Sequence, residues 1–235
     1  MPASGRELVS GPATPPLRGV LFDLDGTLID SAPDLAGAAN RLRADHGLEP
    51  LPLESLRPMV GSGARGMVGV AFGVAPGDER FEALRDAFLA HYAAGLLERT
   101  RPFDGVQEML LALEADGVAW GIVTNKATRF TRPIVAGLGL AQRARVVVCG
   151  DTTPHSKPHP EPLLYAARTL DLAPENVAYV GDDLRDAQAA RAAGMPMLAA
   201  TWGYLGLGEP VHEWGADALV DAPSQVLEWL RARGR

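Results

Sequence analysis

The sequence predicts a doubly wound α/β fold with an all-helical domain inserted after the first strand. Short, unbroken apolar runs alternate with helical patterns along most of the chain, and between residues 31 and 101 only the helical patterns remain. Unbroken apolar runs are typical of strands that are buried on both faces of a parallel sheet. Strands that alternate with helices in this way form a sheet with helices on both faces.

The expected strands are short, and an acidic residue directly follows the first of them. This first strand is Gly19–Phe22, which stops directly before Asp23. Later strands are expected at residues 118–123, 146–149, 177–180, 196–200 and 218–220, and helices between them at residues 104–117, 158–170 and 223–233. Asp104 is a candidate cap for the first of these helices, and prolines favour the start of the second.

The inserted segment contains three expected helices, at residues 33–46, 53–72 and 79–98. Glycine and proline separate these helices at residues 47–52 and 75–77, because both residue types favour turns. Residues 1–16 are rich in proline, glycine and serine and lack the continuous apolar core of a secretory signal, so a flexible tail is expected there. The sequence therefore predicts a core of residues 17–30 and 102–235 and a helical cap of residues 31–101.

The composition argues against several classes of protein. The formal net charge of −7 and the pI near 5.2 disfavour a nucleic-acid partner, because nucleic acid is bound largely through Lys and Arg. No run of about 18 apolar residues is free of charge, so no membrane span is expected. Cys149 is the only cysteine and lies in an apolar run, which predicts a buried thiol in a reducing, cytoplasmic setting. Nothing in the sequence indicates the oligomeric state.

Two acids follow the first strand immediately, in the segment Asp23-Leu24-Asp25-Gly26-Thr27. Open α/β sheets bind their ligands at the carboxyl ends of the strands. Two carboxyl groups this close repel each other when both are ionised. A divalent cation can hold one of them charged while the other is pushed towards its protonated form. The pair can therefore supply a nucleophile and a general acid from one residue type.

Three further segments near strand ends carry groups that suit an anionic substrate. Thr124 and the backbone that follows it offer a hydroxyl and amides that can bind phosphoryl oxygens. Lys157 supplies a positive charge just before a helix, where the helix dipole also favours an anion. Asp182, Asp183 and Asp186 surround another strand-to-helix turn. A net-acidic chain must concentrate positive charge locally to bind an anion, and Lys157 meets that need.

Magnesium is the metal that these oxygens predict, because Mg2+ is a hard ion that prefers near-octahedral oxygen ligands. The carboxylates of Asp23 and Asp182 and the carbonyl of Asp25 are the expected protein ligands, and substrate and water complete the set. An acidic helix start explains Asp183 on its own. It does not explain why four such motifs stand at strand ends.

In their order along the chain, these motifs resemble the haloacid dehalogenase superfamily. The resemblance covers nearly the whole chain and implies a Rossmann-like core with a mobile helical cap. It implies hydrolysis of a small phosphorylated metabolite through an aspartyl phosphate. It also implies a role for each motif: Asp23 is the nucleophile, Asp25 the general acid and base, Thr124, Asn125 and Lys157 the phosphate-binding residues, and Asp182 the acidic magnesium ligand, supported by Asp183 and Asp186.

Finer segments resemble two phosphatase branches of that superfamily. Residues 22–28 and 202–204 are similar to phosphoglycolate phosphatases, whereas residues 61–65 and 181–186 are closer to N-acetylmuramic acid 6-phosphate phosphatases. Both substrates carry a carboxylate, and Arg65 is a candidate to bind it. The same arginine also fits a solvent-facing position at a helix start.

Three other functions fit parts of the pattern. In a haloacid dehalogenase the halide leaves without a proton and without magnesium, which gives Asp25 and Asp182 no purpose. A sugar phosphomutase would keep all four motifs and differ only in the group that accepts the phosphoryl, so it stays open. A non-catalytic binding protein would need neither Asp25 nor Lys157, and both are present.

Overall fold

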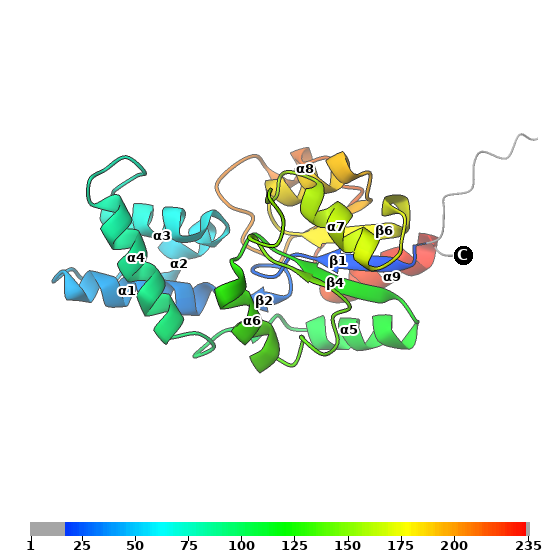
Figure 1. The fold of residues 1–235 in the computed structure, drawn as a ribbon, viewed down its shortest axis with the longest axis horizontal. Coiled ribbons are helices and arrows are strands. Elements are labelled where there is room, and N and C mark those ends of the chain that lie inside the picture. The colour runs from blue at the N-terminus through cyan, green and yellow to red at the C-terminus, as the bar shows by residue number, and fades with distance from the viewer. Residues whose placement is uncertain (1–16, 234–235) are drawn as a thin grey trace, which may run out of the picture.

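A six-stranded parallel sheet forms the centre of the molecule in the computed structural model, which describes residues 17–233 (Figure 1). The strands run in the order β5-β4-β1-β6-β7-β8. The strand order reverses at β1, so the carboxyl end of β1 lies at the crevice where such sheets bind their ligands. The strands are β1 (Gly19–Phe22), β4 (Ala119–Val123), β5 (Val147–Val148), β6 (Val177–Gly181), β7 (Met197–Ala200) and β8 (Ala218–Val220).

Helices cover both faces of this sheet. Val20 and Phe22 of β1 pack on one face with α5, α6 and α9, whereas Leu21 of β1 and Tyr179 of β6 pack on the other face with α7 and α8. All residues of β1 and β6 are buried, as expected between two helical layers. The predicted doubly wound sheet is therefore confirmed. The helices are α5 (Val106–Ala115), α6 (Thr128–Gly137), α7 (Glu161–Thr169), α8 (Leu184–Ala193) and α9 (Pro223–Arg233), with 3-10 turns η2 (Pro174–Asn176) and η3 (Val211–Glu213).

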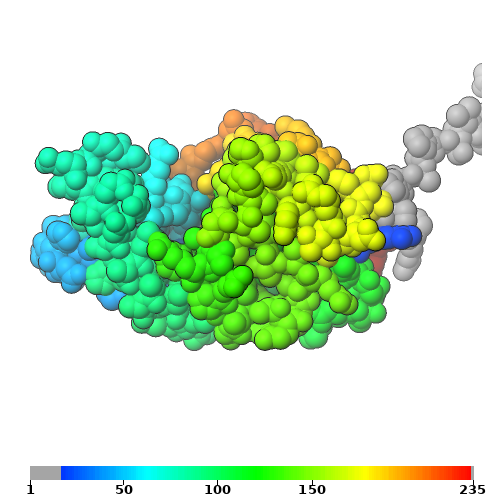
Figure 2. Space-filling model, in the orientation of Figure 1, coloured from blue at the N-terminus to red at the C-terminus, as the bar shows by residue number. Residues whose placement is uncertain are grey.

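The inserted segment forms a second, all-helical unit, which we call the cap. Leu42, Met67 and Phe88 lie at its own hydrophobic centre. Figure 1 shows the cap beyond the carboxyl end of the sheet, and Figure 2 shows it packed against the core along a seam at α6. The cap consists of α1 (Ala32–Asp45), α2 (Leu53–Leu56), the 3-10 helix η1 (Arg57–Ser62), α3 (Gly63–Phe72) and α4 (Phe81–Ala94).

Two adjacent linkers join the cap to the core. They pair as the antiparallel strands β2 (Ile29–Asp30) and β3 (Arg101–Pro102). Beside them, the buried carboxylate of Asp34 accepts hydrogen bonds from the backbone N–H groups of Arg99 and Thr100 at 2.8 and 3.0 Å, and from the Thr100 hydroxyl at 2.6 Å. The beginning and the end of the cap are thus fastened to each other.

Three details of the expected elements are wrong. The single helix expected at residues 53–72 is divided by η1, because Gly63 has φ 60° and ψ −151°, a conformation that essentially only glycine adopts. Gly105, rather than Asp104, immediately precedes α5. The pair β2–β3 was not expected, because two-residue strands are too short to show a hydrophobic period.

Two simpler expectations concern burial and the membrane. Cys149 is buried, as predicted. Within residues 17–233, no helix has the length and apolarity needed to span a membrane. The tail predicted for residues 1–16 lies outside the described residues.

Candidate active site

Asp23 stands at the carboxyl end of β1. Its backbone N–H donates to the carbonyl of Val180 at 2.9 Å, so the sheet fixes its position. Its carboxylate accepts a hydrogen bond from the Leu24 N–H at 2.7 Å and faces the ammonium of Lys157 at 3.0 Å. The side chain is largely buried but still lines the cavity between core and cap. A carboxylate held in this way is oriented for attack on a bound electrophile.

Three carboxylates converge at this point. Oxygens of Asp23, Asp182 and Asp186 lie within 4.8 Å of one another. Burial, reinforced by the charges of Asp186 and Asp25, raises the pKa of Asp23 to about 7, although Lys157 opposes the shift. Burial likewise raises the pKa of Asp182 well above its ordinary value, and Asp23 and Asp186 add to that shift. The cluster thus concentrates more negative charge than nearby cations neutralise, a condition that favours a divalent cation.

Asp182 is tightly enclosed at the end of β6. The hydroxyl of Thr27 donates to one of its oxygens at 2.7 Å, and the backbone N–H of Tyr204 donates to the other at 2.8 Å. Gly26, at φ 89°, and Gly203 approach the side chain so closely that a Cβ on either would overlap it. These contacts fix the direction of the Asp182 carboxylate and explain why glycine stands at both positions.

Lys157 is buried beside the acid cluster. Its ammonium lies 2.7 Å from an oxygen of Asp186 and 3.0 Å from an oxygen of Asp23. It also donates to the hydroxyl of Tyr179 at 2.8 Å, and that hydroxyl donates to the carbonyl of Val123 at 3.0 Å. Burial opposes the charge of Lys157, but the two acids outweigh it and raise its pKa. Lys157 therefore supplies a permanent positive charge beside Asp23.

Asp25 has different partners from Asp23. Its carboxylate accepts a hydrogen bond from the hydroxyl of Ser31. The ammonium of Lys126 lies 3.1 Å from each of its oxygens and 4.7 Å from the centre of the Tyr92 ring, which belongs to α4 of the cap. Burial opposes the charge of Lys126, but Asp25 and Tyr92 raise its pKa. Lys126 was not among the site residues predicted from the sequence. Its position two residues after Thr124, in the loop that follows β4, is the sequence feature that could have indicated it.

The loop after β4 contributes two of the predicted phosphate-binding residues. Thr124 is buried and lines the cavity, and its hydroxyl accepts a hydrogen bond from the N–H of Lys126 at 3.2 Å. Asn125 also lines the cavity, but its carboxamide is bonded at both ends to the backbone of Lys157, at 2.8 Å as donor and 2.9 Å as acceptor. Asn125 therefore joins two loops and holds Lys157 in place.

Asp183 is the N-cap residue of α8 and holds an arginine that contacts the cap. Its carboxylate accepts from the N–H of Arg185 at 2.9 Å, and Asp186 accepts from the N–H of Asp183 at 3.1 Å, which makes a capping box. The guanidinium of Arg185 lies 2.7 Å from the Asp183 carboxylate and also donates to the carbonyl of Gly61 in the cap. Asp183 thus orients the arginine that bridges the two units.

A cavity of about 270 Å³ lies between the acid cluster and the cap. The acids and the two lysines form its polar part, and Arg129, Arg185 and Tyr92 also line it. Arg65, the sequence-based candidate for a carboxylate ligand, is exposed on α3 and is not among the lining residues. The apolar part of the lining consists mainly of Leu35, Val60, Phe88, Leu89 and Phe130.

Comparison with known proteins identifies the family. Residues 20–200 match the model of the haloacid dehalogenase-like hydrolases, and the chain belongs to this family. It is 44% identical over 214 residues to an N-acetylmuramic acid 6-phosphate phosphatase of Pseudomonas aeruginosa, a match that covers 91% of this chain and 95% of the relative. It is 49% identical over 212 residues to a phosphoglycolate phosphatase of Xanthomonas campestris, covering 90% and 95%.

A solved structure supports the same conclusion. The crystal structure of a predicted phosphoglycolate phosphatase from Haemophilus somnus matches this fold with a TM-score of 0.81 at 29% identity, covering 91% of this chain and 97% of that one. The family that the motifs predicted and the class of enzyme, a phosphatase, are thereby confirmed. Both phosphatase branches that the sequence resembles occur among the relatives.

Proposed function

We propose that the protein hydrolyses a small, carboxylate-bearing phosphate ester, as a phosphoglycolate phosphatase does, with Asp23 as the nucleophile. The observation that carries the proposal is the placement of Asp23, whose carboxylate meets Asp182 and Asp186 within 4.8 Å and Lys157 at 3.0 Å. Phosphoryl transfer from an anionic ester depends mainly on positioning and on positive charge at the reacting oxygens. This site offers both, and the phosphatase relatives support the same activity.

Mg2+ is the proposed cation, and the residues around Asp23 fit it. The three clustered donors are all carboxylate oxygens, which suit Mg2+ better than zinc or copper. The raised pKa values of Asp23 and Asp182 support a need for added positive charge at this point. Asp186 joins the sequence-predicted ligands Asp23, Asp25 and Asp182 as a further candidate. When bound, the cation neutralises charge on the phosphoryl oxygens and on the nucleophile.

The side chains of the site account for two successive transfers. Asp23 attacks the phosphorus, and the bond between phosphorus and the ester oxygen breaks while Asp25 donates a proton to that oxygen. The alcohol leaves, and an aspartyl phosphate remains on Asp23. Asp25 then takes a proton from a water molecule that attacks the phosphorus, which releases phosphate and restores Asp23. Lys157 and the hydroxyl of Thr124 hold the phosphoryl oxygens throughout.

N-acetylmuramic acid 6-phosphate is the second candidate substrate, and the apolar lining of the cavity favours it. Phosphoglycolate has one methylene group to place against Leu35, Phe88 and Phe130, whereas the sugar has the methyl groups of its acetyl and lactyl substituents. The chemistry at Asp23 is the same for both. A cytoplasmic location and a small phosphorylated metabolite as the natural ligand stay predictions from the sequence.

A phosphate-release screen tests the proposal and separates the two candidates. The substrates are phosphoglycolate, N-acetylmuramic acid 6-phosphate and common sugar phosphates, compared by kcat/KM. We expect a carboxylate-bearing ester to dominate. Release of phosphate without a phosphorylated activator would rule out the phosphomutase alternative, and a strict need for such an activator would favour it.

Replacing the nucleophile tests the mechanism. Asp23→Asn should lower kcat by about a thousandfold or more while the circular dichroism spectrum stays unchanged. Asp104→Asn is the matched control, because Asp104 is an exposed carboxylate outside the cavity, and it should behave as wild type. Near-wild-type turnover in Asp23→Asn would remove Asp23 as the nucleophile. Activity that survives a chelator would remove the cation from the proposal.

A further inference from the structure

We infer that Arg129, rather than Arg65, binds the carboxylate of the substrate, and that the hydroxyl of Tyr92 donates a second hydrogen bond in the same subsite. The inference rests on the proposed function, because it names the residues that select a carboxylate-bearing ester. Under this assignment, a residue of the core helix α6 and a residue of the cap helix α4 together select the substrate.

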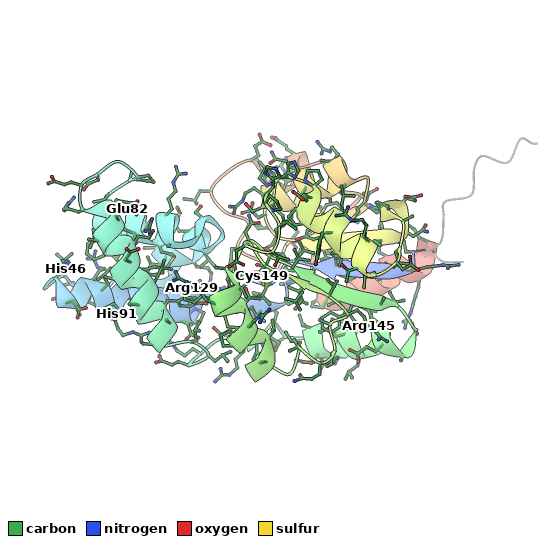
Figure 3. All side chains as sticks on the ribbon, viewed as in Figure 1. His46, Glu82, His91, Arg129, Arg145 and Cys149 are labelled. Atoms are coloured by element: carbon green, nitrogen blue, oxygen red, sulfur yellow. The ribbon has the colours of Figure 1, made fainter. Side chains whose placement is uncertain are left out.

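Arg129 lies in the first turn of α6, where the core meets the cap. Figure 3 shows it at the junction between α4 and α6. Its side chain lines the same cavity as the acid cluster, and its guanidinium carbon lies 4.6 Å from the centre of the Phe130 ring. The guanidinium is planar and presents a fork of N–H groups that suits two-point binding of a carboxylate, and contact with an aromatic ring restricts its orientation.

Arg129 is also the cation of this cavity that lacks an acidic partner within residues 17–233. Asp151, in the neighbouring loop, accepts a hydrogen bond from the N–H of Thr128 at 2.9 Å instead. Thr128 is the main cause of the lowered pKa of Asp151, and Arg129 contributes least to it. The other three cations of the cavity are each paired: Lys157 with Asp23 and Asp186, Lys126 with Asp25, and Arg185 with Asp183.

Tyr92 adds a hydroxyl whose proton has no acceptor within residues 17–233. This hydroxyl is buried, donates no hydrogen bond within the described residues and belongs to a side chain that lines the cavity. The neighbouring ammonium of Lys126, whose pKa Tyr92 helps to raise, can only donate to it, so the hydroxyl proton is left for a ligand. The Tyr92 ring lies 5.3 Å from that of Phe130, so Tyr92 and Arg129 stand in contact with the same aromatic residue. A buried hydroxyl that donates no hydrogen bond destabilises the fold, and a ligand oxygen would accept its proton. Burial raises the pKa of Tyr92 to about 12, so the hydroxyl is a donor at neutral pH.

The position of Arg65 argues for the same assignment. Arg65 and Arg129 are both exposed, but only Arg129 is among the residues that line the cavity. A substrate that ends in a neutral group would leave Arg129 without an anion and Tyr92 without a strong acceptor. The subsite therefore discriminates between phosphate esters by the charge of the end opposite the phosphate.

Kinetics with two matched esters test the inference. Phosphoglycolate ends in a carboxylate, whereas 2-phosphoethanol carries a neutral hydroxyl at that end. For Arg129→Gln we expect KM for phosphoglycolate to rise about tenfold to a hundredfold, the loss expected for a hydrogen bond to a charged group. For 2-phosphoethanol, kcat/KM should change less than about twofold. The same comparison applies to N-acetylmuramic acid 6-phosphate if the screen identifies it as the better substrate.

Matched variants keep the test selective. Arg129→Lys should recover part of the affinity for the carboxylate ester, because it keeps the charge. Arg132→Gln is the control, since Arg132 is exposed on the same helix and does not line the cavity, and Arg65→Gln should likewise match wild type. Tyr92→Phe keeps the ring and should raise KM for the carboxylate ester about threefold to tenfold.

Different results would contradict the role of Arg129, the role of Tyr92 and the proposed function. Equal changes for both esters in Arg129→Gln, or a selective loss in Arg65→Gln, would overturn the assignment of the carboxylate to Arg129. Wild-type KM in Tyr92→Phe would remove Tyr92 from the subsite. A wild-type enzyme that releases phosphate from no ester would instead overturn the proposed function, so the two failures are distinguishable.

Discussion

The ammonium of Lys126 lies 3.1 Å from each carboxylate oxygen of Asp25. The hydroxyl of Ser31 donates to the same carboxylate, so Asp25 is held from two directions. Lys126 also lies against the ring of Tyr92 in the cap, at 4.7 Å from its centre. Asp25, the proposed general acid, is therefore held by a lysine that also contacts a residue of the cap.

Loss of this contact should affect substrates according to their leaving groups. Lys126→Gln should lower kcat about tenfold to a hundredfold for an alkyl phosphate, because a misplaced Asp25 cannot protonate the departing oxygen efficiently. The loss should be less than about threefold for p-nitrophenyl phosphate, whose leaving group departs without a proton. Steady-state assays on both esters measure the difference. Lys126→Arg is the control and should keep most activity; an equal loss for both esters would indicate phosphate binding rather than positioning of Asp25.

The enclosure of Asp182 predicts how the enzyme responds to one added methyl group. Gly203→Ala should displace the carboxylate and weaken the affinity for Mg2+ about tenfold to a hundredfold, a typical effect of disturbing the surroundings of a metal ligand. Titration of activity against Mg2+ concentration measures it. Gly208→Ala provides the comparison, because a Cβ at this exposed glycine meets no atom within 4 Å. An unaltered Mg2+ requirement in Gly203→Ala would show that Asp182 tolerates displacement.

The buried hydroxyl of Tyr179 should contribute to stability. It contacts Lys157 at 2.8 Å and the carbonyl of Val123 at 3.0 Å, and Tyr179→Phe leaves both groups without that partner. We expect the free energy of unfolding in urea to fall by about 1–3 kcal/mol. Tyr165→Phe serves as the reference, since Tyr165 is exposed and should tolerate the change. Equal stability of both variants would mean that water or a neighbouring side chain replaces the lost bonds.

Binding of Mg2+ should strengthen as the pH rises through neutrality. The pKa of Asp23 is raised to about 7 and that of Asp182 well above its ordinary value, so the cation must displace protons at lower pH. The increase in melting temperature on adding Mg2+ should therefore be larger at about pH 8 than at about pH 6. An increase that is the same at both pH values would contradict the raised pKa values.

The metal-free fold should show the opposite trend. Asp23 has a pKa of 3.8 when unperturbed and about 7 in the fold, so between these values the unfolded chain binds fewer protons than the folded one. The contribution of Asp23 to the free energy of unfolding must then fall as the pH rises through this window. Asp23→Asn should remove this contribution, and urea titrations of both proteins in chelator measure it.

The sequence was sufficient to predict the sheet and the gathering of polar side chains at the carboxyl ends of its strands. Buried strands leave unbroken apolar runs, and the carboxyl ends of parallel strands meet at one edge, so Asp23, Thr124 and Asp182 could be expected to lie together. The structure places these three side chains, with Lys157, around one cavity. Both the strand pattern and the polar residue after each strand are local in sequence, which is why they could be recognised.

Residues whose role depends on the contact between core and cap could not be predicted in this way. Lys126 and Arg129 follow Thr124 in the same loop and helix. Nothing in the local pattern indicates that Tyr92 of α4 will lie against Lys126 and against Phe130, the ring on which Arg129 rests. Arg65 was a candidate for the substrate carboxylate, with a solvent-facing position as the alternative, and in the structure its side chain is exposed on α3 and is not among the residues that line the cavity. The spacing of apolar residues along the sequence predicts single helices and strands, but it does not predict which side chains of the core will contact the cap.

The antiparallel pairing of β2 with β3 has an evolutionary consequence. The two linkers of the cap lie side by side, so the ends of any segment inserted at this point are already close together. The entropic cost of closing such an insertion therefore increases only slowly with its length. Inserted helical segments that differ in size and in the residues facing the cavity can therefore replace one another without altering the register of the parallel strands. New selectivities can arise by such exchange while the hydrolytic machinery is inherited intact.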